Sequence, residues 1–346
     1  MGARRTEALD GIRGLAALAF AISGVLALGG HGFAWRFGLG ADVLILFAGF
    51  VTARAHRPAL EAGLGYSRFL ISRIVRVAPL NAAIVAALLC FATVGAVIAT
   101  GRGPDFGAAD AEGFVATLAL VQLLVPGAEA WSPAGWLLSA ELLGSLLLAA
   151  LCRLGVTTQA PGRLALFALI LLAVGARLGA GLTPTEDLAA RAFADFFSGV
   201  LLHALLVSER ARAALKRAKT RAGTALEVWA ALALLGFAAL APETTALLAP
   251  LAAMGPLFVF LRRGGRLSEL LESWAAQVLG RRATSLAVCH PLAFPAYGAL
   301  GALGVLVIAL ALANAIWREV EWPTQRAMWA WLDRRLPEPG AIPNRR

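Results

Sequence analysis

The sequence predicts an all-α polytopic membrane protein with about ten transmembrane helices and with both termini cytoplasmic. Composition is the first reason, because 59% of the 346 residues are hydrophobic and only 15% are charged, too few to cover a soluble surface. The second reason is a series of apolar runs of roughly 17 to 22 residues, which match the hydrocarbon core of a bilayer. Backbone groups in lipid must bond within their own segment, so these runs are expected to be helices. The third reason is that basic residues gather in alternate loops.

Ten segments are expected to span the bilayer. They cover roughly residues 11–29, 39–55, 78–99, 134–151, 164–182, 190–207, 224–241, 245–261, 283–298 and 300–317. The apolar stretch 113–125 is too short to cross easily and is expected to be interfacial or re-entrant. Counting it as a span would place every later loop on the opposite side of the membrane. Without it, 26 of the 31 Lys and Arg residues fall in cytoplasmic segments, which is the charge asymmetry of membrane orientation.

The chain is expected to divide into a transmembrane domain, residues 1–323, and a basic cytoplasmic tail, residues 324–346. Within the tail, TQRAMWAWLDRRL places Trp329 opposite Arg334 and Arg335. This pattern is typical of an amphipathic helix that lies on a membrane surface. We find no internal repeat and no second, soluble domain.

Several kinds of site are not indicated by the sequence. The cysteines Cys90, Cys152 and Cys289 are too scattered for a disulfide framework or a metal site. No P-loop or dinucleotide-binding glycine pattern is present. The net charge of +10 would favour nucleic acid in a soluble protein, but here it follows the loops, so no nucleic-acid partner is expected.

The first apolar segment carries two ionisable residues at its start, Asp10 and Arg13 in LDGIRGLAAL. Residues three apart share a helix face, so the two side chains can form an intrahelical ion pair. Ionisable groups at membrane depth are rare and also indicate function. Gly11 and Gly14 lie on the adjoining face, where they would let another helix approach closely.

Three further ionisable residues lie inside predicted helices, and each leaves two interpretations open. Asp42 either pairs with a neighbouring positive group or acts in a site. Glu141, among Leu, Ala and Gly residues, is either part of a buried ion pair, with Arg13 or Arg177 as partner, or functional. His290 precedes Pro291 and is either a packing residue or a catalyst.

An arginine cluster at the cytoplasmic boundary comprises Arg68, Arg73 and Arg76. Arg73 and Arg76 are three residues apart and therefore share a helix face. Guanidinium groups suit phosphate oxygens, whereas anchoring to anionic lipid would explain the same residues without a ligand. His56 can join this cluster or lie in a solvated loop.

These segments, taken in order, resemble the acyltransferase-3 family, integral membrane enzymes that acylate sugar hydroxyls. LDGIRGLAAL resembles the family's opening, and GLGADVLILFAGFV resembles its glycine–valine–aspartate motif. RFLISRIVRVAPL resembles the arginine-rich segment, and WSPAGWLLSAELLGS the tryptophan–serine–x–serine–x–glutamate motif. LGRRATSLAVCHPL resembles the late serine and histidine–proline helix, and Glu321-Trp322-Pro323 the closing glutamate–x–proline.

The resemblance implies an O-acyltransferase in a bacterial-type inner membrane. The expected donor is acyl-coenzyme A, with acetyl as the acyl group, and the expected acceptor is a carbohydrate or glycolipid hydroxyl. Its catalytic residues would be His290, Glu141, Asp42 and Arg13; Arg73, Arg76 and Arg68 would hold the donor, and no metal is expected.

The sequence departs from the family pattern at one position. In the family, the arginine that corresponds to Arg13 is followed by ten residues and then by a histidine, taken as the catalytic base. Gly24 stands there, preceded by Ser23. His31 lies two helical turns further, roughly 10 Å away, so His290 is the better substitute. Three hypotheses follow: an active enzyme with a rearranged base, an inactive member that serves as a subunit of a larger membrane complex, or a transporter-like protein.

Overall fold

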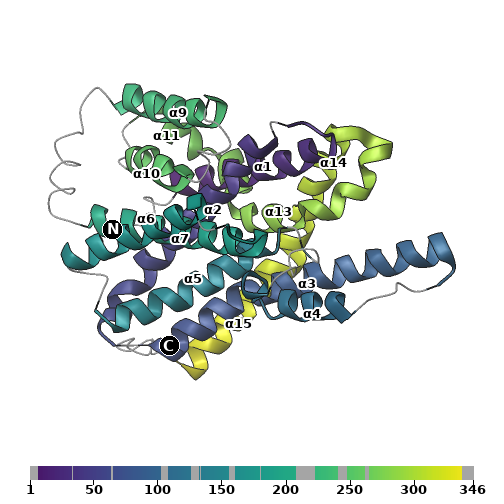
Figure 1. Ribbon diagram of the computed structural model, residues 1–346, viewed down its shortest axis with the longest axis horizontal. Coiled ribbons are helices and arrows are strands. Elements are labelled where there is room, and N and C mark those ends of the chain that lie inside the picture. The colour runs from purple at the N-terminus through teal and green to yellow at the C-terminus, as the bar shows by residue number, and fades with distance from the viewer. Residues whose placement is uncertain are drawn as a thin grey trace, which may run out of the picture.

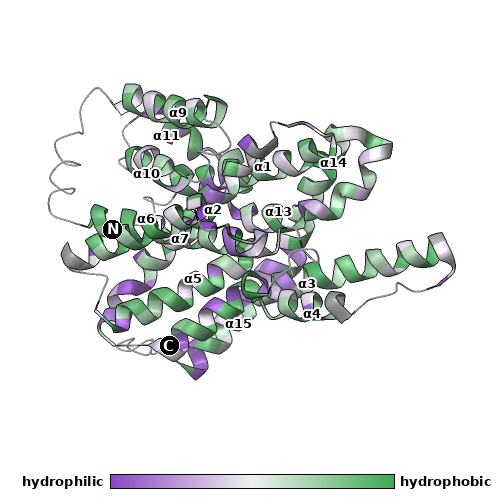
Figure 2. Cartoon of the chain, in the orientation of Figure 1, coloured by the Kyte–Doolittle hydropathy of each residue, from purple (hydrophilic) through white to green (hydrophobic). Residues whose placement is uncertain are grey.

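The structure, a computed structural model, is an assembly of helices (Figure 1), and most of these helices consist largely of hydrophobic residues (Figure 2). It describes residues 7–32, 34–63, 65–102, 108–125, 132, 134–155, 160–179, 181–207, 223–240, 248–261 and 265–336. No strand occurs within these ranges. Eight helices there are long and apolar enough to cross a membrane, which confirms the all-α polytopic fold. The basic loop 208–222 and residues 337–346 lie outside the described ranges.

Seven predicted spans correspond to single long helices. These are α1 (Glu7–Leu28), α2 (Ala34–Glu61), α3 (Tyr66–Thr100), α5 (Trp136–Arg153), α6 (Ala160–Gly179), α7 (Pro184–Leu206) and α9 (Gly223–Leu240). The eighth predicted span is the shorter α10 (Ala249–Phe260), whose 12 residues cover only about 18 Å. Short helices α11 (Arg266–Leu271) and α12 (Trp274–Arg281) follow.

The last two predicted spans lie in one continuous helical stretch, Ala283–Arg335. It comprises α13 (Ala283–Cys289), the 3₁₀ segment η5 (His290–Ala296), α14 (Tyr297–Ile316), the π-helical turn η6 (Trp317–Glu321) and α15 (Trp322–Arg335). Gly301, with φ 64° and ψ −172°, interrupts α14, a conformation that glycine adopts without strain. This interruption falls close to the predicted boundary between the two spans. The described residues thus contain eight candidate spans against the predicted ten, and α10 is a shorter apolar helix that is not among them.

The segment expected to be interfacial or re-entrant is a broken helix. α4 (Ala108–Leu118) has 11 residues, which reach only about 16 Å. Leu120 then adopts φ 62°, and the short 3₁₀ segment η2 (Gln122–Leu124) packs against α5 and α7. No continuous span is therefore formed here.

Small residues let α1 approach the short helices α11 and α12 closely. A Cβ at Gly11 would meet the backbone of Leu271, and one at Gly14 would meet the backbone of Leu279 and Gly280. These contacts confirm that Gly11 and Gly14 permit close packing, with α11 and α12 as the partners. Asp10 and Arg13 are thereby held at the junction of α1 with the C-terminal third of the chain.

α2 and α7 pack closely against each other. A Cβ at Gly49 would meet the carbonyl oxygen of Phe196, and one at Gly199 would meet that of Leu46. Phe196 is fully buried. The two backbones therefore approach closely, and α2 also lines the cavity described below.

The C-terminal helix α15 packs on the first half of α3. Arg68 forms an ion pair with Asp333 (2.5 Å) and donates to the carbonyl oxygen of Leu336. Leu332 is fully buried. The described part of the predicted tail therefore packs against α3, and it continues the helical stretch that contains α14.

Candidate functional site

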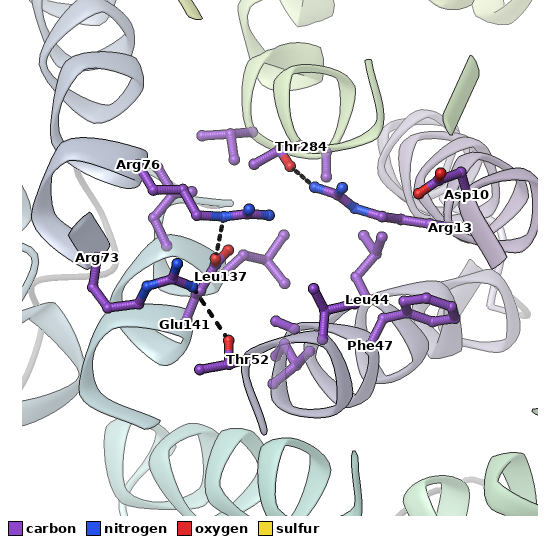
Figure 3. Close-up of a pocket in the computed structure, with 16 residues that line it drawn as sticks. Asp10, Arg13, Leu44, Phe47, Thr52, Arg73, Arg76, Leu137, Glu141 and Thr284 are labelled. Atoms are coloured by element: carbon purple, nitrogen blue, oxygen red, sulfur yellow. Dashed lines mark hydrogen bonds and ion pairs between the residues drawn. The ribbon is translucent and has the colours of Figure 1, made fainter. Parts of the chain in front are cut away.

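A cavity of about 320 Å³ lies among five helices, α1, α2, α3, α5 and α13 (Figure 3). Its walls are mostly apolar, with Leu44, Phe47 and Leu137 among them. The ionisable residues among those that line it are Asp10, Arg13, Arg73, Arg76 and Glu141. Three positive and two negative side chains leave a formal excess of one positive charge, which favours an anionic or strongly polarised ligand.

Glu141 is the residue on which the arginines converge. Its Oε1 lies 2.5 Å from Arg76 Nε, and its side chain is 10% exposed. Arg13 and Arg73 also act on this carboxylate electrostatically. The sequence led us to expect Arg13 or Arg177 as the partner; the closest partner is Arg76, while Arg177 binds Asp187 at 2.7 Å.

Arg13 reaches across the cavity from α1 to α13, where its guanidinium group donates a hydrogen bond to the Thr284 hydroxyl (Figure 3). Asp10 lies one turn earlier and also lines the cavity. The contact with Thr284 fixes Arg13 toward the space between the helices. The pattern of the first helix alone could not predict this partner, 271 residues away.

Arg73 is held by three side chains around the cavity rim. Its Nη1 donates to Thr52 Oγ1 at 3.4 Å, and its Nη2 lies 3.0 Å from His56 Nε2. The guanidinium group also lies over the Phe69 ring, 5.6 Å from the ring centre. His56 therefore belongs to the arginine cluster rather than to a solvated loop. Thr52, which the sequence analysis did not single out, is part of the site.

Of the seven predicted site residues, the structure brings four together, Arg13, Arg73, Arg76 and Glu141, and leaves three outside the cavity lining. Arg68 faces α15, as described above. Asp42 faces α7, where Arg191 Nε binds it at 2.5 Å.

His290 is the third predicted residue outside the cavity lining. It is buried, with Nδ1 3.0 Å from the carbonyl oxygen of Ala287 and with edge contacts to the rings of Phe20 and Phe294. A Cβ at Gly24 would lie 2.8 Å from His290 Nε2. The imidazole therefore occupies the space beside residue 24. His31, the other candidate for the missing base, is exposed in the turn after α1.

Glu321 links the C-terminal helices to the arginine cluster. Lying at the end of the π-helical turn, it accepts hydrogen bonds from the Ser285 hydroxyl and from Gln325 Nε2 (3.2 Å). Gln325 Nε2 also lies 3.3 Å from the carbonyl oxygen of Arg76. Such π-helical turns are often found at functional sites. The sequence signals for this link were the late serine, Ser285, and the glutamate–x–proline motif that contains Glu321, whereas no motif pointed to Gln325.

The fold and the cavity define a polytopic membrane protein with a charged site enclosed between its helices. Residues 6–318 match the Acyl_transf_3 family model, described as an acyltransferase domain. The chain therefore belongs to this family of membrane acyltransferases, as its motifs predicted. No curated protein and no solved structure gives a significant match.

Proposed function

We propose that this protein transfers an acyl group, acetyl in the first instance, from acyl-coenzyme A to a hydroxyl group of a carbohydrate or glycolipid. The membrane would be of the bacterial inner-membrane type. The observation that carries the proposal is the gathering of Arg13, Arg73 and Arg76 around Glu141 in one cavity. Family membership supports acyl transfer, and the chemistry of these side chains supports the choice of substrates.

The donor side of the proposal rests on Arg73 and Arg76. Their guanidinium groups lie on consecutive turns of α3, and such groups bind phosphate oxygens well. A volume of about 320 Å³ is at the small end of ligand cavities. The cavity would thus enclose the thioester end of the donor while the rest lies outside. For Arg68 to contact the donor, its ion pair with Asp333 would have to open.

In the proposed reaction, the acceptor hydroxyl oxygen attacks the thioester carbonyl carbon, and the carbon–sulfur bond breaks. The hydroxyl proton is lost, and the coenzyme A thiolate gains one, so the products are an ester and a thiol. Arg13 would stabilise the negative oxygen that forms on the carbonyl group. Glu141 would accept the hydroxyl proton, since it and Asp10 are the carboxylates among the residues that line the cavity.

The remaining two predicted residues would support this reaction from outside the cavity. Asp42 would hold α2 against α7 through Arg191. His290 would act as the base only for an acceptor that reaches the Gly24 side of α1. A loss of turnover in Glu141→Gln would therefore indicate an acceptor in the cavity. A loss of turnover in His290→Ala would indicate an acceptor on the Gly24 side of α1.

The test is acetyl-coenzyme A turnover by the purified protein, with and without candidate acceptors. We expect Glu141→Gln to reduce turnover by about 100-fold or more, the range for loss of a general base. Glu319→Gln is the matched control, because Glu319 is 69% exposed and pairs with its neighbour Arg318. Wild-type turnover in Glu141→Gln would exclude Glu141 as the base.

A second candidate function is a non-catalytic subunit of a larger membrane complex. The observation that favours it is Gly24, which supplies no side chain where the family resemblance predicts a base. In that case acetyl-coenzyme A would bind, with affinity reduced in Arg73→Ala and Arg76→Ala, but no acceptor would be acylated. Co-purification with other membrane proteins would support this function, and measurable turnover would exclude it.

A further inference from the structure

A second ionic cluster, made by Asp42, Arg191 and Asp195, lies between α2 and α7, outside the cavity lining. Arg191 donates to both carboxylate oxygens of Asp42, from Nε at 2.5 Å and from Nη2 at 2.9 Å. Its guanidinium group also lies over the Trp136 ring, 5.8 Å from the ring centre. Asp42 and Arg191 therefore neutralise each other in a two-point ion pair.

Asp195 adds a second carboxyl group to this cluster. It lies one helical turn after Arg191, its side chain is fully buried, and the Asp42 carboxylate acts on it electrostatically. Neither of its oxygens accepts a hydrogen bond from an N–H or O–H group of the described residues. An ionised carboxylate buried in this way is costly unless a positive charge accompanies it.

Two hydroxyl oxygens on α7 and its neighbour α5 are also buried and without a hydrogen bond among the described residues. Ser198 follows Asp195 on the same face of α7, and Ser139 comes from α5. α5 runs beside α7 here, because Trp136 lies at Arg191 and a Cβ at Gly144 would touch the Phe196 ring. Ser139 therefore lies on a helix that packs against α7. Buried polar atoms without partners mark a place where a further group belongs.

The cluster lacks one positive charge. Two carboxyl groups face one guanidinium group, and within the described residues no second cation forms an ion pair with either carboxyl group; Arg177 acts on Asp195 only at longer range. Arg177 on α6 is bound by Asp187, at 2.7 and 3.1 Å. α10 contains no ionisable residue, η2 contributes only the uncharged Gln122, and Glu141 on α5 binds Arg76.

We propose that the Asp42–Asp195 pair binds one monovalent cation. The cation is either a proton shared by the two carboxyl groups or a sodium ion held by Asp195 with the Ser139 and Ser198 hydroxyl oxygens. Both supply the missing charge, and hard cations prefer such oxygen ligands. The site is separate from the proposed acyl transfer and does not depend on it.

The test is the thermal unfolding of the purified full-length protein in detergent, at pH 6 and pH 9, in sodium chloride or choline chloride of equal concentration. With a bound proton, the Tm falls from pH 6 to pH 9 in both salts, because the folded state holds a proton that the unfolded carboxyl group releases. With bound sodium, sodium chloride raises the Tm at pH 9 and choline chloride does not.

Asp195→Asn identifies the site, because it removes the charge but keeps the shape of the side chain. We expect the Tm of this variant to lose its dependence on pH or on sodium, whichever the wild-type protein shows. Glu319→Gln, which changes an exposed acidic residue outside the cluster, should keep it. If Asp195→Asn does not fold, Asp195→Ser takes its place. A wild-type Tm that is equal in all four conditions, or a dependence unchanged in the Asp195 variant, would overturn the proposal.

Discussion

Gly24 and His290 fit together where α1 meets η5: a methyl group at residue 24 would lie 2.8 Å from His290 Nε2 and equally close to the Phe294 ring. The His290 ring therefore occupies the space that a side chain at residue 24 would need. A larger residue at position 24 requires His290 to move.

Gly24→Ala should consequently destabilise the protein by about 1–3 kcal/mol, the usual cost of an extra methyl group in a filled interior. Adding His290→Ala should recover part of the loss, because it removes the ring that the methyl group meets. Thermal unfolding in detergent measures both effects. Gly236→Ala on α9 is the control, since nothing lies within 4 Å of a Cβ there; equal stability of the two alanine variants would contradict this packing.

Arg76 and Glu141 should show strong coupling in a double-mutant cycle. Removing either partner leaves the other charge without its 2.5 Å contact, so Arg76→Ala and Glu141→Ala should each destabilise the protein. The double variant should lose less than the sum, with a coupling free energy of about 0.5–3 kcal/mol. Unfolding midpoints of the four proteins give this value, and simple additivity would argue against a direct pair.

Alanine at Gly49 or Gly199 should weaken the contact between α2 and α7. Each Cβ would meet a backbone carbonyl oxygen, of Phe196 and Leu46 respectively, and backbone cannot move aside as a side chain can. We expect a loss of about 1–3 kcal/mol for each variant, measured by thermal unfolding. Gly95→Ala, where nothing is within 4 Å, should be neutral or slightly stabilising; a similar loss there would make the effect non-specific.

Glu227 stabilises the start of α11 through its hydrogen bonds. It is buried and accepts hydrogen bonds from the backbone N–H groups of Gly265, Leu267 and Ser268, and from the Ser268 hydroxyl. Glu227→Ala should cost about 1–3 kcal/mol, because buried donors then lack a partner. Turnover per folded molecule should not change; a loss of turnover with unchanged stability would show a different role.

The parts of the fold that sequence could predict depend on local pattern. Span length and loop charge predict the helices, and the pair Gly11 and Gly14 predicts a close helix contact. The three-residue spacing of Arg73 and Arg76 places both side chains on one helix face, and both line the cavity. Arg68 is five residues earlier, about 7.5 Å along the helix, which is far enough to reach α15 instead.

Pairings between distant segments could not be predicted in this way. Asp42 was expected either to pair with a positive group or to act in a site; its partner is Arg191, 149 residues away. Glu141 pairs with Arg76 rather than with Arg13 or Arg177. Helix order does not determine which of several interior arginines reaches a given carboxylate, because that depends on how the helices rotate and pack.

The length of α3 has a consequence for access from water. The helix has 35 residues, and the portion from Val77 to Thr100 alone is about 36 Å long, longer than the roughly 30 Å hydrocarbon layer. The turn that carries Arg73 and Arg76 can therefore sit at the level of the lipid headgroups. A water-soluble molecule could then reach these arginines without crossing the hydrocarbon core of the bilayer.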